Sequence, residues 1–166
     1  MRFTGMEKGM KSWTSLCAAL MLTVATTWVP LLASANMGSD DSSESQDPNW
    51  VAGKKAVEAQ DWKQATQLLS KAALTDPNNA DIQNWLGYAQ RKQGNLNAAF
   101  TAYNQALKLN PNHKGAHEYI GEAYLMAGDV AKAEKHLAEL QRLCSPIPCE
   151  ELKDLQRAIQ EYKKKK

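Results

Sequence analysis

The chain has 166 residues, of which 43% are hydrophobic and 23% are charged. This composition excludes a wholly disordered chain, because enough apolar residues are present to build a core. The length allows one ordinary domain or a few small repeats. The formal net charge of +2 gives no basis for bulk binding to nucleic acid, and we expect none.

The first 35 residues have the pattern of a secretion signal. Basic residues outnumber acids before Ser12, and no charge occurs from Ser12 to Ser39. The uncharged stretch is largely apolar up to the small-residue sequence Ala33-Ser34-Ala35. This order is typical of a signal peptide, and we expect cleavage after Ala35. An uncleaved membrane anchor is the alternative, because the uncharged stretch is nearly long enough to span a bilayer.

An acidic and polar segment follows the signal. Residues 36–47 include Asp40, Asp41, Glu44 and Asp47 and contain no base. They offer little to bury, so we expect a disordered acidic linker. The signal predicts an exported protein, in the periplasm if the source is bacterial, with an N-terminally anchored protein as the alternative.

A spacing of 34 residues organises the chain from residue 46 to residue 147. Glycine recurs at Gly53, Gly87 and Gly121. The other columns in this register are Ala65, Ala99 and Ala133; Asp61, Asn95 and Asp129; Leu69, Tyr103 and Leu137; Ala72, Ala106 and Leu140; and Pro77 and Pro111. Self-similarity at a fixed period of this length is the signature of a repeat protein.

Each repeat has the pattern of two antiparallel helices. Apolar residues recur at intervals of three and four, which places them on one helix face. Asp61, Asn95 and Asp129 precede the second helix, where a short polar side chain can cap free N–H groups. Gly94 and Gly128 suit the left-handed turn that ends the first helix. We expect helices at residues 48–60, 63–75, 80–93, 96–109, 114–127 and 130–143.

Residues 85–112 resemble a tetratricopeptide repeat. The matching positions are Leu86, Gly87, Gly94, Ala99, Tyr103, Ala106 and Pro111. Residues 46–79 and 114–147 match more loosely, with departures at Ala52, Gln60, Leu140 and Ser145. The resemblance implies an all-α fold, a right-handed α-solenoid of three helix-turn-helix repeats (46–79, 80–113 and 114–147) and a C-terminal cap at 148–166.

Cys144 and Cys149 flank a short proline-containing loop. An even number of cysteines in an exported chain indicates a disulfide. Four intervening residues do not match a thioredoxin-like centre, and no histidine follows as in a haem attachment site. The alternative is a thiol-redox or metal protein that uses these cysteines, with His136 as a further ligand.

A last helix is expected from about Cys149 to Tyr162. Leu152, Leu155, Ile159 and Tyr162 form one apolar stripe at helical spacing. We expect the stripe to cap the last repeat in a monomer, and a dimer seam is the alternative. A cysteine loop joined to such a helix also resembles part of some small exported bacterial repeat proteins. We expect the basic run Lys163–Lys166 to be a solvated helix end, and weak contact with an anionic membrane surface is the alternative.

The sequence contains no pattern that indicates catalysis. It lacks a phosphate-binding glycine loop, a nucleophile motif and a paired zinc motif. His113 and His117 are four residues apart, but His113 is expected in a turn and no third ligand completes a metal site. We therefore expect no enzyme activity, no cofactor and no metal.

The resemblance implies that the first helix of each repeat lines a concave groove. The groove residues carried over in this way are Trp50, Lys54, Val57, Glu58, Asn84, Tyr88, Arg91, Lys92, Glu118, Glu122, Leu125 and Met126. We expect exposed side chains at Trp50, Tyr88, Leu125 and Met126, surrounded by charges of both signs. Such a mixture suits an extended or helical peptide. The family's site for C-terminal carboxylates is disfavoured, because Trp50 and Lys54 replace its first pair and Trp85 and Tyr119 occupy two of its other positions.

The resemblance predicts a non-catalytic interaction module of the cell envelope. Its partner would be a peptide or protein segment bound in the groove. Two alternatives remain open at this point. One is an envelope scaffold anchored by an uncleaved N-terminal helix, and the other is the thiol-redox or metal protein described above.

Overall fold

The computed structural model describes residues 47–165. The helices in this range are α1 (Pro48–Glu58), α2 (Trp62–Thr75), α3 (Ala80–Lys92), α4 (Leu96–Leu109), α5 (Lys114–Met126), α6 (Val130–Leu143) and α7 (Glu150–Lys164). The expected signal at 1–35, all of the expected linker before Asp47, and Lys166 lie outside the described residues. None of the described helices combines the length and apolar character needed to cross a bilayer.

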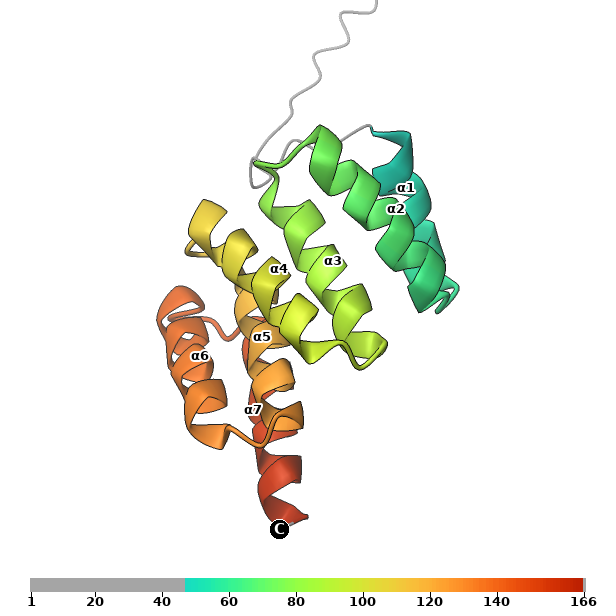
Figure 1. Ribbon diagram of the computed structural model, residues 1–166. Helices are drawn as coiled ribbons and strands as arrows, with labels where there is room; N and C mark the ends of the chain where they lie inside the picture. Colours follow the sequence, from blue (N-terminus) through green and yellow to red (C-terminus); the bar gives the residue numbers. More distant parts are fainter. Residues whose placement is uncertain (1–46, 166) are drawn as a thin grey trace, which may run out of the picture. The chain divides into compact units, whose positions relative to one another are not determined.

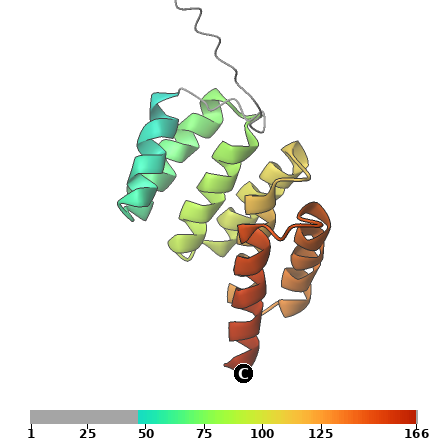
Figure 2. The same cartoon turned by 180° about the vertical axis from the view of Figure 1, so that it is seen from behind.

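The first six helices form three antiparallel pairs, α1 with α2, α3 with α4 and α5 with α6 (Figure 1). Successive pairs stack through α2 on α3 and α4 on α5. The last helix, α7, packs against both α5 and α6, and Figure 2 shows it crossing in front of α5. The predicted all-α solenoid with a final capping helix is therefore confirmed.

Local sequence signals place the helix ends. Each of the seven helices begins and ends within two residues of its expected bounds. Asp61 and Asp129 each accept a hydrogen bond at 3.0 Å from the backbone N–H three residues later, as capping residues do. The expected cap at Asn95 is wrong, because its amide donates instead to Gln90 Oε1 on the preceding helix at 3.1 Å.

The turn inside each pair requires a left-handed residue. Gly94 and Gly128 both have a φ of 82°. Gln60 holds the equivalent place in the first repeat with a φ of 57°. A side chain in this region of backbone space costs on the order of 1 kcal/mol relative to glycine. The fold therefore imposes the turn even where the sequence supplies no glycine.

The recurring glycines at 53, 87 and 121 mark close helix approaches. A Cβ on Gly53 would lie 2.8 Å from Leu69 of α2, and one on Gly87 would lie 2.6 Å from Tyr103 of α4. At Gly121 the nearest side chain is Leu155 of α7, at 2.7 Å. Glycine is required here by packing rather than by backbone conformation. In the third repeat the close contact is made with α7.

The helix α7 continues the 34-residue register, with a leucine at the place that glycine holds in the repeats. Leu155 lies 34 residues after Gly121 and is fully buried. Leu152 and Ile159 on the same stripe are also buried, in one cluster with Leu125 of α5. The stripe expected on the last helix thus covers the third repeat within the same chain.

A disulfide joins Cys144, at the end of α6, to Cys149, at the start of α7, with a Cα separation of 5.5 Å. The predicted pairing is confirmed. Because both cysteines stand at helix ends, the bond fixes the short loop that turns the chain from α6 back onto α5. At the other end of α7, Lys163 forms an ion pair with Glu134 of α6 at 2.6 Å.

Removal of the disulfide should lower the free energy of unfolding by about 2 kcal/mol, the chain-entropy value for so short a loop. The Cys144→Ala/Cys149→Ala variant and the wild type can be compared by urea unfolding. A reductant should destabilise the wild type by a similar amount and leave the variant unchanged. Equal stability of the oxidised wild type and the variant would contradict this prediction.

Candidate functional site

The expected groove residues lie on the first helix of each pair. We call the side of α1, α3 and α5 that carries Trp50, Lys54, Tyr88, Arg91 and Glu122 the inner-helix face. The residues on it are supplied at matching positions of successive repeats, so their side chains form rows across the three helices.

Half of the expected groove residues are buried. They are Trp50, Val57, Asn84, Arg91, Glu118 and Leu125. The expectation of exposed Trp50 and Leu125 is wrong. Trp50 belongs to the core cluster of α1, α2 and α3, and Leu125 is covered by the stripe of α7. Met126 is exposed as expected, and Tyr88 is half-buried.

A continuous row of aromatic rings crosses the inner-helix face. The ring centroids of Trp50 and Trp85 lie 6.4 Å apart, those of Trp85 and Tyr88 lie 5.9 Å apart, and those of Tyr88 and Tyr119 lie 4.9 Å apart. Trp62 at the start of α2 adds a side contact to Tyr88 at 5.9 Å. We call these five residues the aromatic row.

Three members of the aromatic row were absent from the expected groove residues, namely Trp62, Trp85 and Tyr119. A signal for two of them was available, because Trp85 and Tyr119 are 34 residues apart and each follows an expected groove position. Trp62 carried no such signal, because it lies on the second helix of its repeat. All three are half-buried, so each ring keeps part of its surface accessible.

Cationic side chains lie over the aromatic row. Lys54 Nζ is 5.0 Å from the ring centre of Trp50, and Lys92 Nζ is 5.3 Å from that of Tyr88. The Arg91 guanidinium carbon is 5.3 Å from the ring centre of Tyr88 and 5.7 Å from that of Tyr119. Such contacts hold positive charge on the ring faces. This part of the inner-helix face therefore combines flat apolar surface with positive charge.

Arg91 links the aromatic row to acidic residues on α5. Its guanidinium forms an ion pair with Glu122 at 2.6 Å, with side chains 8% and 26% exposed. Burial is the largest single influence and lowers the pKa of Arg91, but Glu122, Tyr103 and Tyr88 together raise it by more, so the pKa lies above its usual value. Arg91 is therefore a buried cation whose charge is committed to Glu122.

Glu118, one turn before Glu122, is a buried acid without such a partner. Its side chain makes no hydrogen bond or ion pair within residues 47–165, and the residue is 8% exposed. Burial, followed by the nearby charges of Glu122, Asp154 and Glu151, raises its pKa to about 8, with Arg91 acting in the opposite direction. Burial, followed by the nearby Glu118, Tyr88 and Glu122, raises the pKa of Tyr119 to about 12, with Arg91 acting in the opposite direction.

Four buried polar atoms of the described chain lack a hydrogen-bond partner. They are Trp50 Nε1, Asn84 Oδ1, Arg91 Nε and the Tyr103 hydroxyl. Each such atom costs on the order of 1–3 kcal/mol when no partner replaces water. Three of the four belong to expected groove residues. Among the expected groove residues, two donors (Trp50 Nε1 and Arg91 Nε) and one acceptor (Asn84 Oδ1) are thus without a hydrogen-bond partner in the described chain.

His113 supports the fold rather than a metal site. Its Nδ1 accepts a hydrogen bond from the backbone N–H of Ala116 at 3.2 Å and so caps α5. Its Nε2 lies 3.0 Å from Asp81 Oδ1. Within the described range, no group of three or more His, Cys, Asp or Glu side chains is placed to hold a metal ion.

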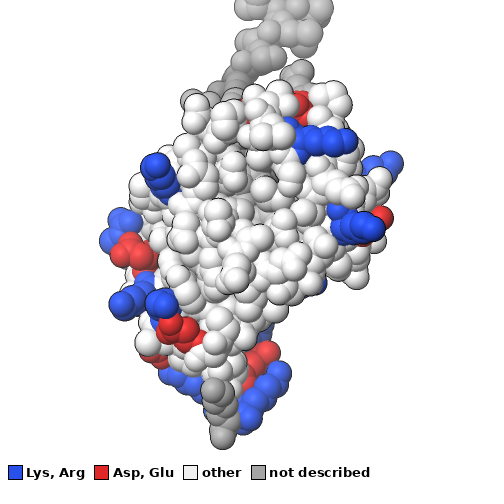
Figure 3. All heavy atoms as spheres, in the orientation of Figure 1, with Lys and Arg blue, Asp and Glu red and all other residues white. Residues whose placement is uncertain are grey.

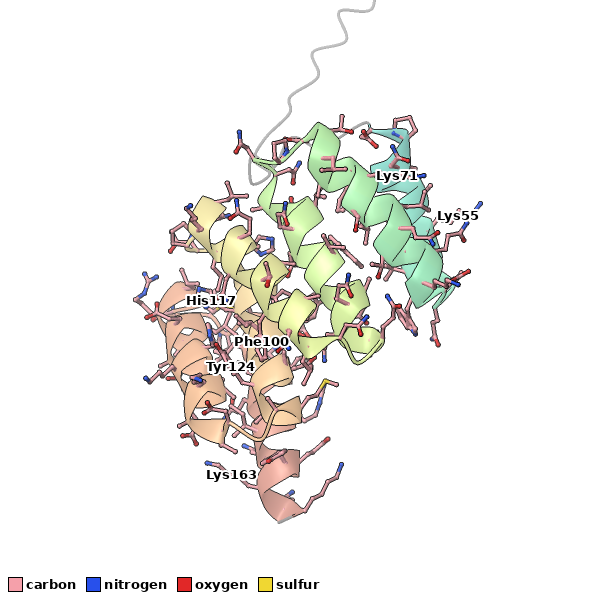
Figure 4. The ribbon with its side chains drawn as sticks, viewed as in Figure 1. Lys55, Lys71, Phe100, His117, Tyr124 and Lys163 are labelled. Atoms are coloured by element: carbon pink, nitrogen blue, oxygen red, sulfur yellow. A yellow bond between two sulfur atoms is a disulfide. The ribbon has the colours of Figure 1, made fainter. Side chains whose placement is uncertain are left out.

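His117 of α5, labelled in Figure 4, is buried and pairs with the half-buried His136 of α6. His117 Nε2 lies 2.9 Å from the Pro111 carbonyl, which can only accept, so this nitrogen donates. The other nitrogen, His117 Nδ1, lies 3.0 Å from His136 Nδ1. Burial and the neighbouring His117 lower the pKa of His136 to about 4. His136 is therefore neutral near pH 7, and the pair has a structural role.

Two other surfaces differ from the inner-helix face. An open hollow of about 770 Å³ lies at the α2–α3 and α4–α5 turns, with polar lining residues that include Asp76, Asn110 and His113. None of the expected groove residues lines it. On the side seen in Figure 3, uncharged atoms fill the centre, and charges gather at the margins and toward α7.

The sequence matches a known family model. A tetratricopeptide repeat model matches residues 51–112 and 91–146. The chain therefore belongs to the tetratricopeptide repeat family. A comparison with curated proteins finds no match.

Solved structures of this family are similar to the chain. MamA MSR-1 is 29% identical with a TM-score of 0.54, over 57% of this chain and 55% of the MamA chain. The match thus spans little more than half the length of that relative. PcrH, solved with the chaperone binding region of PopD, is 17% identical with a TM-score of 0.63, over 70% and 90% of the two chains.

A third similar structure is the first tetratricopeptide domain of RPAP3, solved with the HSP90 peptide SRMEEVD. It is 21% identical with a TM-score of 0.59, over 67% of this chain and 87% of that domain. RPAP3 and PcrH thus share the fold of this chain.

Proposed function

We propose that this protein is an interaction module of the cell envelope that binds a peptide or protein segment along the inner-helix face. The observation that carries the proposal is the aromatic row with its overlying cations. Half-buried rings offer rigid apolar surface at low entropic cost, which is why aromatic residues and arginine dominate binding energies at interfaces. The similar structures of PcrH and RPAP3 support it, since each was solved with a bound segment.

The proposed binding region is shorter than three full repeats. The stripe of α7 covers Leu125, so the third repeat contributes mainly Tyr119 and Glu122 near its contact with α3. The first two repeats supply Trp62, Trp85 and Tyr88. The proposed segment therefore lies across α1 and α3 and ends at α5.

The envelope context rests on the sequence and on one feature of the structure. Residues 1–35 have the pattern of a secretion signal, and the disulfide is of a kind that persists in oxidising compartments. Retention of the N-terminal segment as an anchor would place the same module at the membrane surface. The mass of the protein isolated from its cells distinguishes the two forms.

Selection from a random peptide library displayed on phage tests the binding role. Selected peptides should bind the purified protein and lose at least ten-fold in affinity on Tyr88→Ala, because this ring contacts three others of the aromatic row. Thr101→Ala is the matched control, since Thr101 is exposed on α4. Peptides that bind the two variants equally well, or the absence of any binder, would contradict the proposal.

A crosslinker in the cell connects this test to the natural partner. A photoreactive residue at position 88 should capture one envelope protein, and the same residue at position 101 should not. Adducts that form from 163–165 and not from 88 would favour the scaffold hypothesis instead.

A further inference from the structure

One end of the inner-helix face has an excess of acidic side chains. Glu118 and Glu122 on α5 face Glu151 and Asp154 on α7, and we call these four residues the acidic end. The inference from these residues rests on the proposed function and adds the kind of side chain that the bound segment places there.

The charges of the acidic end are only partly balanced. Arg91 pairs with Glu122 at 2.6 Å, and Asp154 pairs with Arg157 at 2.6 Å. Glu118 makes neither a hydrogen bond nor an ion pair within the described chain, although the residue is 8% exposed. A buried carboxyl in this setting is unusual, because buried acids are normally paired. Glu118 therefore has no donor within the described chain, and its carboxyl oxygens, which are not among the fully buried atoms, can be reached from solvent.

Asn84 gives a second and independent sign of a missing donor. It holds the same place on α3 that Glu118 holds on α5, and it is 4% exposed. Its Oδ1 is one of the buried atoms without a partner. Its Nδ2 lies 3.3 Å from the place that a Cβ on Gly115 would take, one turn before Glu118. A buried amide oxygen on α3 and the Glu118 carboxyl on α5, at matching positions of their helices, thus lack donors within the described chain.

We propose that the acidic end binds a lysine or arginine side chain of the segment that lies along the aromatic row. An ammonium or guanidinium group supplies only donors, which is what Glu118 and Asn84 require. The Tyr119 ring, next to Glu118 in sequence, adds a face on which a cation is stabilised. Lys92, which is exposed and lies over the Tyr88 ring, repels a basic residue from that part of the face. Charge therefore sets the direction in which the segment lies.

Binding of a cation at the acidic end is coupled to a proton. The pKa of Glu118 is about 8, raised by burial and by Glu122, Asp154 and Glu151 and opposed by Arg91. The carboxyl is mostly protonated at pH 7 and must ionise to pair with the ligand. The affinity of a basic peptide should therefore rise between pH 6 and pH 9, with release of a proton.

Parallel selections on two forms of the protein test this inference. The same phage library is selected on the wild type and on Glu118→Gln, which keeps the shape of the side chain. Lysine or arginine should be enriched at one position in wild-type binders and not in the binders of the variant. In a chosen peptide, replacement of that residue by glutamine should cost at least ten-fold in affinity for the wild type and less than two-fold for Glu118→Gln.

The matched control is Glu139→Gln, because Glu139 is an exposed acid on α6, which carries none of the expected groove residues. It should bind the chosen peptide as the wild type does. The rise in affinity between pH 6 and pH 9 should be present in the wild type and in Glu139→Gln, and absent in Glu118→Gln.

The outcomes separate the two proposals. Two results overturn this inference and leave the proposed function standing. In the first, the selected peptides depend on Tyr88 but carry no enriched basic residue. In the second, selection on Glu118→Gln enriches the same basic residue as selection on the wild type. A lack of any Tyr88-dependent binder overturns both. Self-association without peptide, abolished by Lys164→Ala/Lys165→Ala, would also overturn it, by showing that a second copy occupies the acidic end.

Discussion

The Gly87→Ala variant should have a free energy of unfolding about 3 kcal/mol below that of the wild type, the upper range for overpacking a core. A Cβ at this position would lie 2.6 Å from two ring carbons of Tyr103 and 3.0 Å from a third. Tyr103 is fully buried, so its ring cannot move aside without displacing packed neighbours. Urea unfolding followed by circular dichroism measures the difference.

Gly94→Ala is the matched control for this prediction. Gly94 has no heavy atom within 4 Å of a Cβ position, and its φ is 82°. The substitution therefore adds backbone strain of about 1 kcal/mol and no steric overlap. If Gly87→Ala is as stable as Gly94→Ala, the close approach of α3 and α4 at this glycine is wrong.

The Glu118→Gln variant should be more stable than the wild type at pH 9 and equally stable near pH 4.5. The pKa of Glu118 is raised from 4.5 to about 8 in the folded state, mainly by burial. Between these values the folded chain holds a proton that the unfolded chain releases, so wild-type stability falls as the pH rises. Glutamine removes this loss, and the gain at pH 9 should be about 2 kcal/mol once partial contact with water is allowed for.

Urea unfolding at several pH values between 4.5 and 9 checks the prediction. The lowered pKa of His136 gives an opposite trend between about pH 4 and pH 6.5, but it is present in both proteins and cancels in the difference. Glu122→Gln is the contrasting variant. It should destabilise the protein by about 3 kcal/mol, because Arg91 would be left buried without its partner. A pH-independent gain in Glu118→Gln would contradict the assigned cause.

Local patterns in the sequence were sufficient to predict the helices. The spacing of apolar residues, the caps at Asp61 and Asp129 and the turn glycines act over a few residues, and each is read directly from its neighbours in the chain. The disulfide between Cys144 and Cys149 was predictable for the same reason, since its loop is short. Among the expected caps only Asn95 was wrong, because its side chain bonds Gln90 on the preceding helix instead of a backbone N–H of α4.

The properties of the inner-helix face depended on contacts between distant segments. Leu125 is buried because α7 returns onto α5, and Glu118 is buried beside acids that belong to α7. The contact of Trp62 with Tyr88 joins two different repeats. A repeat pattern predicts the position of a residue within its repeat. It does not predict which side chains pack against that position at the end of the array.

The register of α7 also bears on how such a chain lengthens in evolution. Duplication of residues 80–113 would add one helix pair and leave both the contact of Gly121 with Leu155 and the disulfide intact. An insertion between Leu143 and Glu150 would separate both pairs at once. The contacts of the C-terminal end are therefore compatible with duplication inside the array and incompatible with insertion at the C-terminal junction.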